Sequence, residues 1–95
     1  MRLKVFGKLW RMVWLAKGEA VPGKLLASEK GLCESPDVVG KTIYIRDERP
    51  DAETLDTLIH EMLHAADWSK SEFWVHDVAN DLTRNILKVF RIERL

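Results

Sequence analysis

The sequence predicts a single α+β domain in which a small, mostly antiparallel sheet packs on two helices. Three observations predict this fold. The chain has only 95 residues, its first half places glycine and proline between short β-rich runs, and its second half has two stretches with helical periodicity. A chain of this length has room for one hydrophobic core, so residues 1–95 are expected to form one domain. The composition, 46% hydrophobic and 32% charged, is that of a folded domain.

The first half of the chain supplies the predicted strands. Residues 3–15 are rich in β-forming side chains and are interrupted by Gly7, which predicts two short strands or one bent strand. The stretch that follows is mostly loop, with room for a short strand around Cys33. Residues 41–47 alternate with the period of a half-buried strand. One face of that strand carries Ile43 and Ile45, and the other carries Thr42, Tyr44 and Arg46.

The second half supplies two predicted helices. Asp51 is the expected N-cap of the first helix, which ends near Asp67. Its apolar stripe consists of Leu55, Leu58, Ile59, Met62, Leu63 and Ala66. The second helix is expected to begin at Ser69 or Ser71. Its predicted buried stripe consists of Val75, Val78, Ala79, Leu82, Ile86, Val89 and Phe90.

Composition excludes several classes of protein. A single cysteine, Cys33, allows neither an internal disulfide nor a cysteine-rich zinc module, which favours a reducing compartment. The apolar run Met12–Ala16 is far too short to span a membrane. Lys8 and Arg11 interrupt the apolar segment that a signal peptide needs. We therefore expect a cytoplasmic protein that does not bind membranes.

The net charge of zero hides an uneven distribution. Residues 29–83 hold thirteen acidic side chains against five basic ones, whereas the segments on either side are basic. Basic ends of this kind are usually solvated surface, and we do not expect nucleic-acid binding. The acidic middle suits divalent cations.

The chemistry lies in the first helix. His60 and His64 are four residues apart, so both imidazoles project from one helix face and can reach a single metal ion. Glu61 is next to His60, where its carboxylate could take a proton from a water on the metal. Imidazole and carboxylate ligands with one open position are typical of catalytic Zn²⁺. The alternative, that the two histidines are ordinary residues of a half-buried face, does not explain why three such residue types share this spacing.

A water-activating zinc ion usually has three protein ligands, so one more is needed. Glu72 and His76, four residues apart on the second helix, are both candidates, and spacing alone does not choose between them. Glu72 also has a structural interpretation. In the run Ser69–Glu72 it would be the last residue of a capping box that starts the helix.

Residues 57–65 resemble the extended consensus around the His-Glu-x-x-His motif of zincin metallopeptidases, and the short chain resembles the gluzincin clan, especially the minigluzincins. Over almost its whole length the chain is similar to small zincin-like proteins that are common in bacteriophage genomes. The segments that carry this similarity are 7–11, 31–33, 36–37, 41–45, 55–61, 64–68 and 71–72.

The resemblance has several implications. It implies a minimal zincin-like catalytic core, a location in the host cytoplasm if the chain is phage-encoded, and Glu72 as the third ligand. It also implies that the strand Ile43–Arg46 is the edge strand that pairs with an extended peptide substrate. Larger gluzincins have an aspartate four residues after the ligand glutamate. Here His76 holds that position, with Asp77 beside it, so Asp67 or Asp77 could supply the carboxylate that orients a ligand histidine, and the alternative for each is a capping or surface acid.

Three other kinds of side chain have competing interpretations. Cys33 is expected to be a buried thiol, with a location beside the metal as the alternative. Tyr44 is expected to pack in the strand, with stabilisation of an oxyanion as the alternative. The four tryptophans are expected to anchor the core and the helix packing rather than to form a binding cage. They are Trp10, Trp14, Trp68 and Trp74.

The function predicted from the sequence is that of a zinc-dependent metallopeptidase that acts on a peptide or protein. Zn²⁺ would be held by His60, His64 and Glu72, with Glu61 as general base. The alternative is a zinc-stabilised, non-catalytic protein-binding module, since metal affinity can hold a small domain together. A third interpretation has the basic ends dock a protein or a nucleic acid, with an idle zinc site. The sequence does not predict the substrate or the oligomeric state.

Overall fold

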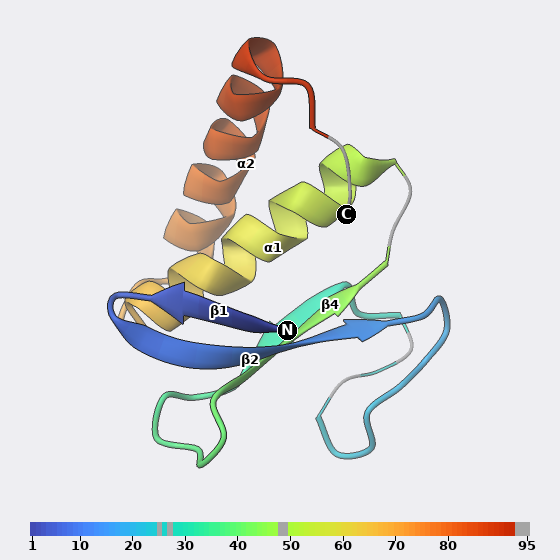
Figure 1. Ribbon diagram of the computed structural model, residues 1–95, viewed down its shortest axis with the longest axis vertical. Helices are drawn as coiled ribbons and strands as arrows, with labels where there is room; N and C mark the ends of the chain where they lie inside the picture. Colours follow the sequence, from blue (N-terminus) through green and yellow to red (C-terminus); the bar gives the residue numbers. More distant parts are fainter. Residues whose placement is uncertain (25, 27, 48–49, 93–95) are drawn as a thin grey trace.

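The computed structural model describes residues 1–24, 26, 28–47 and 50–92, which form a four-stranded mixed sheet and two helices (Figure 1). The predicted α+β fold is therefore confirmed. The elements in chain order are β1 (Arg2–Val5), β2 (Lys8–Leu15), β3 (Gly31–Cys33), β4 (Thr42–Arg46), α1 (Asp51–Ala66) and α2 (Glu72–Val89).

The strand order in the sheet is β1-β2-β4-β3. β1 and β2 form an antiparallel hairpin whose turn contains Phe6 and Gly7, both at positive φ, so the prediction of two strands around Gly7 is confirmed. β3 pairs with β4 antiparallel, whereas β2 and β4 are parallel. Because β4 lies inside the sheet, the expectation that Ile43–Arg46 is a free edge strand is wrong. The edge strand on that side is β3.

β4 is buried on both faces rather than half-buried as its alternation predicts. Ile43 and Ile45 point into the core, as expected. On the other face, the Arg46 guanidinium donates hydrogen bonds to the backbone carbonyls of Ala16, Leu26 and Glu29 at 2.7, 3.0 and 2.6 Å. The long connection between β2 and β3 thus covers this face, and a cation with three carbonyl partners is satisfied there.

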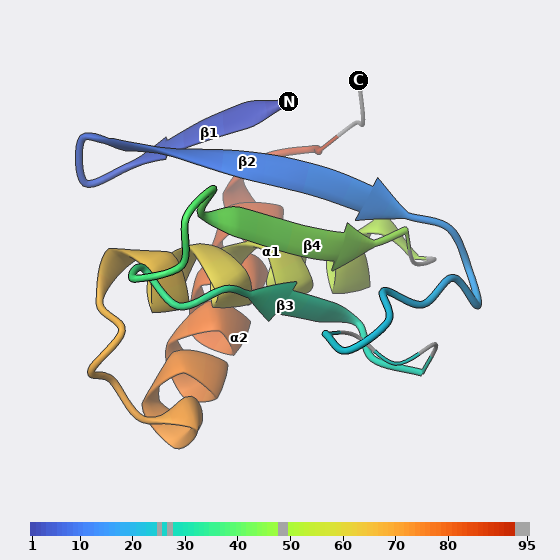
Figure 2. The same ribbon diagram turned by 90° about the horizontal axis from the view of Figure 1, so that it is seen from below.

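The helices form two further layers on one side of the sheet (Figure 2). α1 packs on β1, β3 and β4, and α2 packs on α1. The core lies between the sheet and α1, where Leu58 and Met62 of the helix contact buried strand residues. These strand residues are Val5, Trp10, Met12, Cys33, Ile43 and Ile45. No helix within the described ranges is long and apolar enough to cross a membrane.

The start of α1 differs in detail from the prediction, whereas α2 starts at Ser71, one of the two predicted positions. The N-cap of α1 is Pro50, so Asp51 is the first helical residue, where its charge suits the positive end of the helix dipole. Ser71 is the N-cap of α2, and its hydroxyl accepts a hydrogen bond from the backbone N–H of Trp74 at 3.1 Å. Glu72 is therefore the first residue of α2. The capping box predicted for Ser69–Glu72 does not form, which leaves the Glu72 carboxylate available for other partners.

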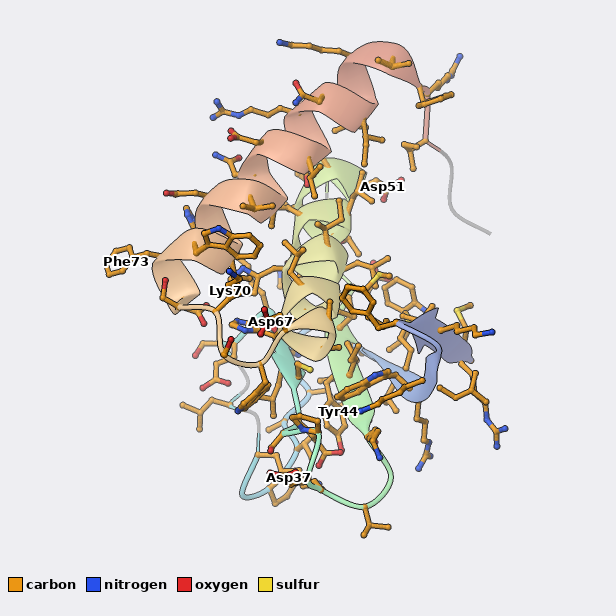
Figure 3. All side chains as sticks on the ribbon, turned by 90° about the vertical axis from the view of Figure 1, so that its left-hand side faces the viewer. Asp37, Tyr44, Asp51, Asp67, Lys70 and Phe73 are labelled. Carbon is orange, nitrogen blue, oxygen red and sulfur yellow. The ribbon has the colours of Figure 1, made fainter. Side chains whose placement is uncertain are left out.

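The predicted apolar stripe of α2 is buried only in its first half. Val75 and Ala79 are fully buried, but Leu82, Val89 and Phe90 are exposed. The reason is that α2 runs on past the first turn of α1, so nothing within α1 covers its last turns (Figures 1 and 3).

The expectation that the tryptophans anchor the core holds for Trp10, which is 1% exposed, whereas the other three are exposed to a large extent. These are Trp14, Trp68 and Trp74.

Candidate metal centre

α1 brings His60 and His64 together in the way that their spacing predicts. The two residues are one helical turn apart, and their ring centroids are 4.9 Å from each other. Both side chains are mostly buried, with 19% and 14% of their surface exposed. The helix therefore presents two imidazoles side by side at the end that leads into the turn before α2.

Glu72, the first residue of α2, meets both histidines. Its Oε1 lies 2.7 Å from Nε2 of His60, and its Oε2 lies 2.8 Å from Nε2 of His64. Burial alone would raise the pKa of Glu72, but the charges of the two histidines and their hydrogen bonds bring it below its usual value. The carboxylate thus bridges two ring nitrogens that belong to a different helix.

His76 does not join this cluster. Its side chain is exposed, and its Nδ1 lies 3.4 Å from the Asp77 carboxylate. Neither aspartate considered as a partner for the ligand histidines is seen in that role. Asp67 instead accepts hydrogen bonds from the backbone N–H and the hydroxyl of Ser69, at 3.1 and 2.6 Å, and so shapes the turn between the helices (Figure 3). Of the two candidates for a third ligand, the fold brings Glu72 to the histidines.

Glu61 is buried beside the cluster and incompletely paired. It is 6% exposed, and its Oε1 lies 3.8 Å from Nε2 of His60. Its carboxylate accepts a hydrogen bond from the backbone of Cys33 in β3, while its buried Oε2 has no hydrogen-bond partner among the residues described. Burial raises the pKa of Glu61 to about 8, the charge of Glu72 adds to the rise, and the hydrogen bond from Cys33 opposes it.

Cys33 and Tyr44 lie on different sides of β4 relative to the cluster. The Cys33 thiol is buried, as expected, and lies 3.4 Å from the backbone carbonyl of Glu34, to which it donates. Burial raises the pKa of the thiol to about 12, with smaller effects from Glu61 and Glu34. Cys33 lines a cleft that His64 and Glu72 also line, so its location beside a metal stays a prediction. Tyr44 alternates with Ile43 and Ile45 and so lies on the face of β4 away from α1, with Lys24 over its ring. It cannot reach an oxyanion beside His60.

Gly31 is a site residue in the stretch that the sequence predicts to be mostly loop. A Cβ atom at this position would lie 2.8 Å from Cγ2 of Thr57, 2.9 Å from the backbone oxygen of Tyr44 and 3.3 Å from Cγ of Glu61. Only glycine lets β3 approach α1 closely enough for the Cys33 backbone to hold Glu61. A glycine inside a strand signals such a close approach, and this signal was present in the sequence.

Replacement of Gly31 with alanine should therefore destabilise the fold by about 1–3 kcal/mol, because both the Thr57 methyl group and a β4 carbonyl are in the way. Urea unfolding of the variant measures this change. The double variant Gly31→Ala/Thr57→Ser removes one of the two obstacles and should recover part of the loss. Lys30→Ala, at the neighbouring exposed position, is the matched control and should stay within about 0.5 kcal/mol of the parent. Equal stability of the Gly31 and Lys30 variants would contradict the close approach.

Two clefts adjoin the cluster and share Gly31, Glu61 and Glu72 in their walls. The first has a volume of about 510 Å³ and extends along Glu29 and Lys30. The second has a volume of about 420 Å³ and is also lined by Leu32, Cys33, His64, Trp68 and Lys70. The cluster therefore lies where two open clefts meet, beside the free edge of β3.

The donor set fits a zinc ion. The ligand atoms of His60, His64 and Glu72 all lie within 4.8 Å of one another, and His₂Glu is a known ligand set of catalytic zinc, with bonds of about 2.0–2.2 Å. Both histidines present the same ring nitrogen, Nε2, to the Glu72 carboxylate. Oε1 of Glu61, 3.8 Å from Nε2 of His60, is a further acceptor beside the cluster.

The chain was compared with known proteins. No protein-family model matches it, and searches of curated proteins and of solved structures found no significant match.

Proposed function

We propose that this protein is a zinc-dependent metallopeptidase, with His60, His64 and Glu72 as metal ligands and Glu61 as general base. The observation that carries this proposal is the state of Glu61. It is a buried carboxylate with one unpartnered oxygen, placed beside three candidate ligands. The similarity of residues 57–65 to the zincin consensus supports the same proposal.

A purely structural zinc site would not require a buried carboxylate with an unpartnered oxygen, as Glu61 has. Structural sites are closed by four protein ligands and need no base. A buried carboxyl group with an unsatisfied oxygen also costs stability, and groups of this kind cluster at functional sites. The combination of three candidate ligands with a buried, incompletely paired acid therefore favours hydrolysis over scaffolding.

The proposed chemistry assigns each residue one task. Zinc, when bound, would polarise the carbonyl of the scissile bond and lower the pKa of a water molecule toward 7. The Glu61 carboxylate would accept a proton from that water as the water oxygen adds to the scissile carbonyl carbon, and would deliver the proton to the amine nitrogen as the C–N bond breaks. The backbone of Cys33 would hold the carboxylate in place during both transfers.

The main chain of the substrate would pair with β3. The backbone oxygen of Lys30 accepts from Arg46 and the backbone N–H of Glu34 donates to Thr42, at 2.8 and 3.0 Å. Because partners alternate along an antiparallel ladder, the polar backbone groups of Gly31 point away from β4, toward the outer edge. β-Augmentation at this edge would place an extended peptide next to Glu61. We therefore propose β3, rather than β4, as the edge strand that pairs with the substrate.

Removal and return of the metal tests the proposal. Protein stripped with a chelator should lose hydrolysis of a mixture of decapeptides, and one equivalent of Zn²⁺ per chain should restore it. Cleavage products are identified by mass spectrometry. Since the ligands come from both α1 and α2, a zinc-stabilised binding module makes a different prediction. In that case the stripped protein unfolds and the reloaded protein refolds without cleaving any peptide.

A further inference from the structure

The larger of the two clefts, which we call the acidic cleft, has a wall of carboxylates in addition to the proposed catalytic residues. Glu29, Glu53 and Asp56 line it together with Glu61 and Glu72. Glu29 comes from the connection before β3, and Glu53 and Asp56 come from the first half of α1. Distant segments of the chain therefore converge on one concave surface. The acidic bias of residues 29–83 is thus concentrated beside the metal centre.

Among the residues that the structure describes, few cations line this wall. Lys30 lies 3.8 Å from Glu53, but its side chain is 61% exposed and the pair is open to solvent, so it neutralises the cleft only weakly. His76 also lines the cleft and is exposed. Glu61 also lines the cleft, is 6% exposed, and has no hydrogen-bond partner for its Oε2 among the residues described. A carboxylate wall around an unsatisfied buried acceptor is complementary to a positively charged ligand group.

The β3 edge fixes where such a group would enter. Glu29 and Lys30 line only the acidic cleft, Leu32 and Cys33 line only the second cleft, and Gly31 borders both. A peptide paired with β3 would therefore cross from one cleft to the other at Gly31, next to Glu61. Side chains on one side of the scissile bond would face carboxylates, and those on the other side would face Leu32, Trp68 and Lys70.

We propose that the acidic cleft selects a lysine or arginine side chain in the substrate, on one side of the bond that is cut. The proposal rests on the proposed peptidase function and adds the substrate class to it. The carboxylates of Glu29, Glu53 and Asp56 attract the cationic side chain and repel an acidic one. Each exposed ion pair contributes little binding free energy, and we expect the three carboxylates together to give lysine about a 10-fold advantage in kcat/KM over an uncharged isostere. Added salt should reduce this advantage.

Two measurements test this selectivity, one with turnover and one without. The probes are positional-scanning decapeptides that carry lysine, its uncharged isostere norleucine, or glutamate at a single scanned position. The zinc-loaded wild-type protein should cleave the lysine series with about 10-fold higher kcat/KM than the norleucine series at low salt. The zinc-loaded Glu61→Gln variant, used as a non-cleaving form, should bind the two series in the same order by fluorescence anisotropy.

Matched variants locate the selectivity in the cleft. The triple variant Glu29→Gln/Glu53→Gln/Asp56→Asn should lose the preference for lysine. A second triple variant, Glu19→Gln/Asp37→Asn/Asp81→Asn, removes the same charge from exposed positions outside the cleft and should keep the preference (Figure 3 labels Asp37).

The outcomes separate this inference from the proposed function. Cleavage without a preference for lysine overturns the inference and leaves the peptidase proposal standing. Selective binding of lysine peptides without cleavage supports the cleft and overturns the peptidase. Failure of every peptide series to bind or be cleaved overturns both, and an equal loss of preference in the two triple variants overturns the location in the cleft.

Discussion

Replacement of Glu61 with glutamine should abolish hydrolysis and, at the same time, make the metal-free protein more stable at pH 8. Loss of the proposed general base is expected to cost at least about 100-fold in rate, while the three ligands still bind zinc. The gain in stability has a separate cause. Folding buries this carboxylate and raises its pKa from 4.5 to about 8. Glutamine fills the same space, keeps an acceptor for the Cys33 backbone and carries no charge to bury.

The pH dependence of the free energy of unfolding determines which of the two proteins is more stable. Between pH 4.5 and 8 the unfolded chain has lost the Glu61 proton and the folded chain retains it, so the free energy of unfolding of the wild-type protein falls as pH rises. The glutamine variant lacks this loss. Its advantage should be near zero below pH 4.5, should grow across the window and should level off above pH 8, where it is on the order of 4 kcal/mol.

Urea unfolding of the metal-free proteins at pH 4, 6 and 8 measures the difference, and zinc content and peptide cleavage are measured on the metal-loaded forms. Glu53→Gln is the matched control, because it makes the same change on the same helix at a side chain that is 49% exposed. Its stability should follow that of the wild-type protein at every pH. A Glu61 variant that is no more stable than wild type at pH 8 would show that the carboxylate is not buried as described. Retained turnover would remove the general-base assignment.

The spacing of His60, Glu61 and His64 predicts the centre of the site because a helix makes its geometry local. Residues at i and i+4 must share a face, and neither histidine depends on the rest of the fold for that. The strands around Gly7, Cys33 and Ile43 were predictable for the same reason, since turn residues and alternation are local signals.

The order of those strands was not predictable, because it depends on pairings between distant segments. β4 inserts between β2 and β3, and this single fact moves the free edge from Ile43–Arg46 to Gly31–Cys33. It also explains why Arg46 is buried and why the acidic side chain of Glu29 reaches the site. The sequence contains the residues of the acidic cleft, but only the tertiary fold assembles them.

Glu72 illustrates how a local signal can mislead. Its run with Ser69 has the pattern of a capping box, which would have occupied the carboxylate at the helix start. Ser71 caps α2 instead, and the turn held by Asp67 and Ser69 delivers Glu72 to the two histidines. This competition between two caps, separated by only two residues, decides whether the Glu72 carboxylate can reach His60 and His64.

The clearest consequence is a difference between two variants of α2. Glu72→Ala should weaken zinc binding by more than about 100-fold, since even the residues that merely support metal ligands are worth 10- to 100-fold. His76→Ala, one helical turn further on, should bind zinc with unchanged affinity. Competition with a chromophoric chelator measures both constants, and the visible spectrum of the Co²⁺-substituted protein reports the ligand set independently of any activity.

The zinc affinities of the two variants can be compared directly because neither substitution should disturb the fold. The Glu72 side chain is 71% exposed and the His76 side chain is 68% exposed, and the cap of α2 depends on Ser71, which both variants keep. A loss of zinc in the Glu72 variant therefore reports coordination rather than a damaged helix. If the His76 variant loses zinc and the Glu72 variant keeps it, the bridge between Glu72 and the two histidines is not a ligand arrangement, and the assignment of the metal centre has to be reversed.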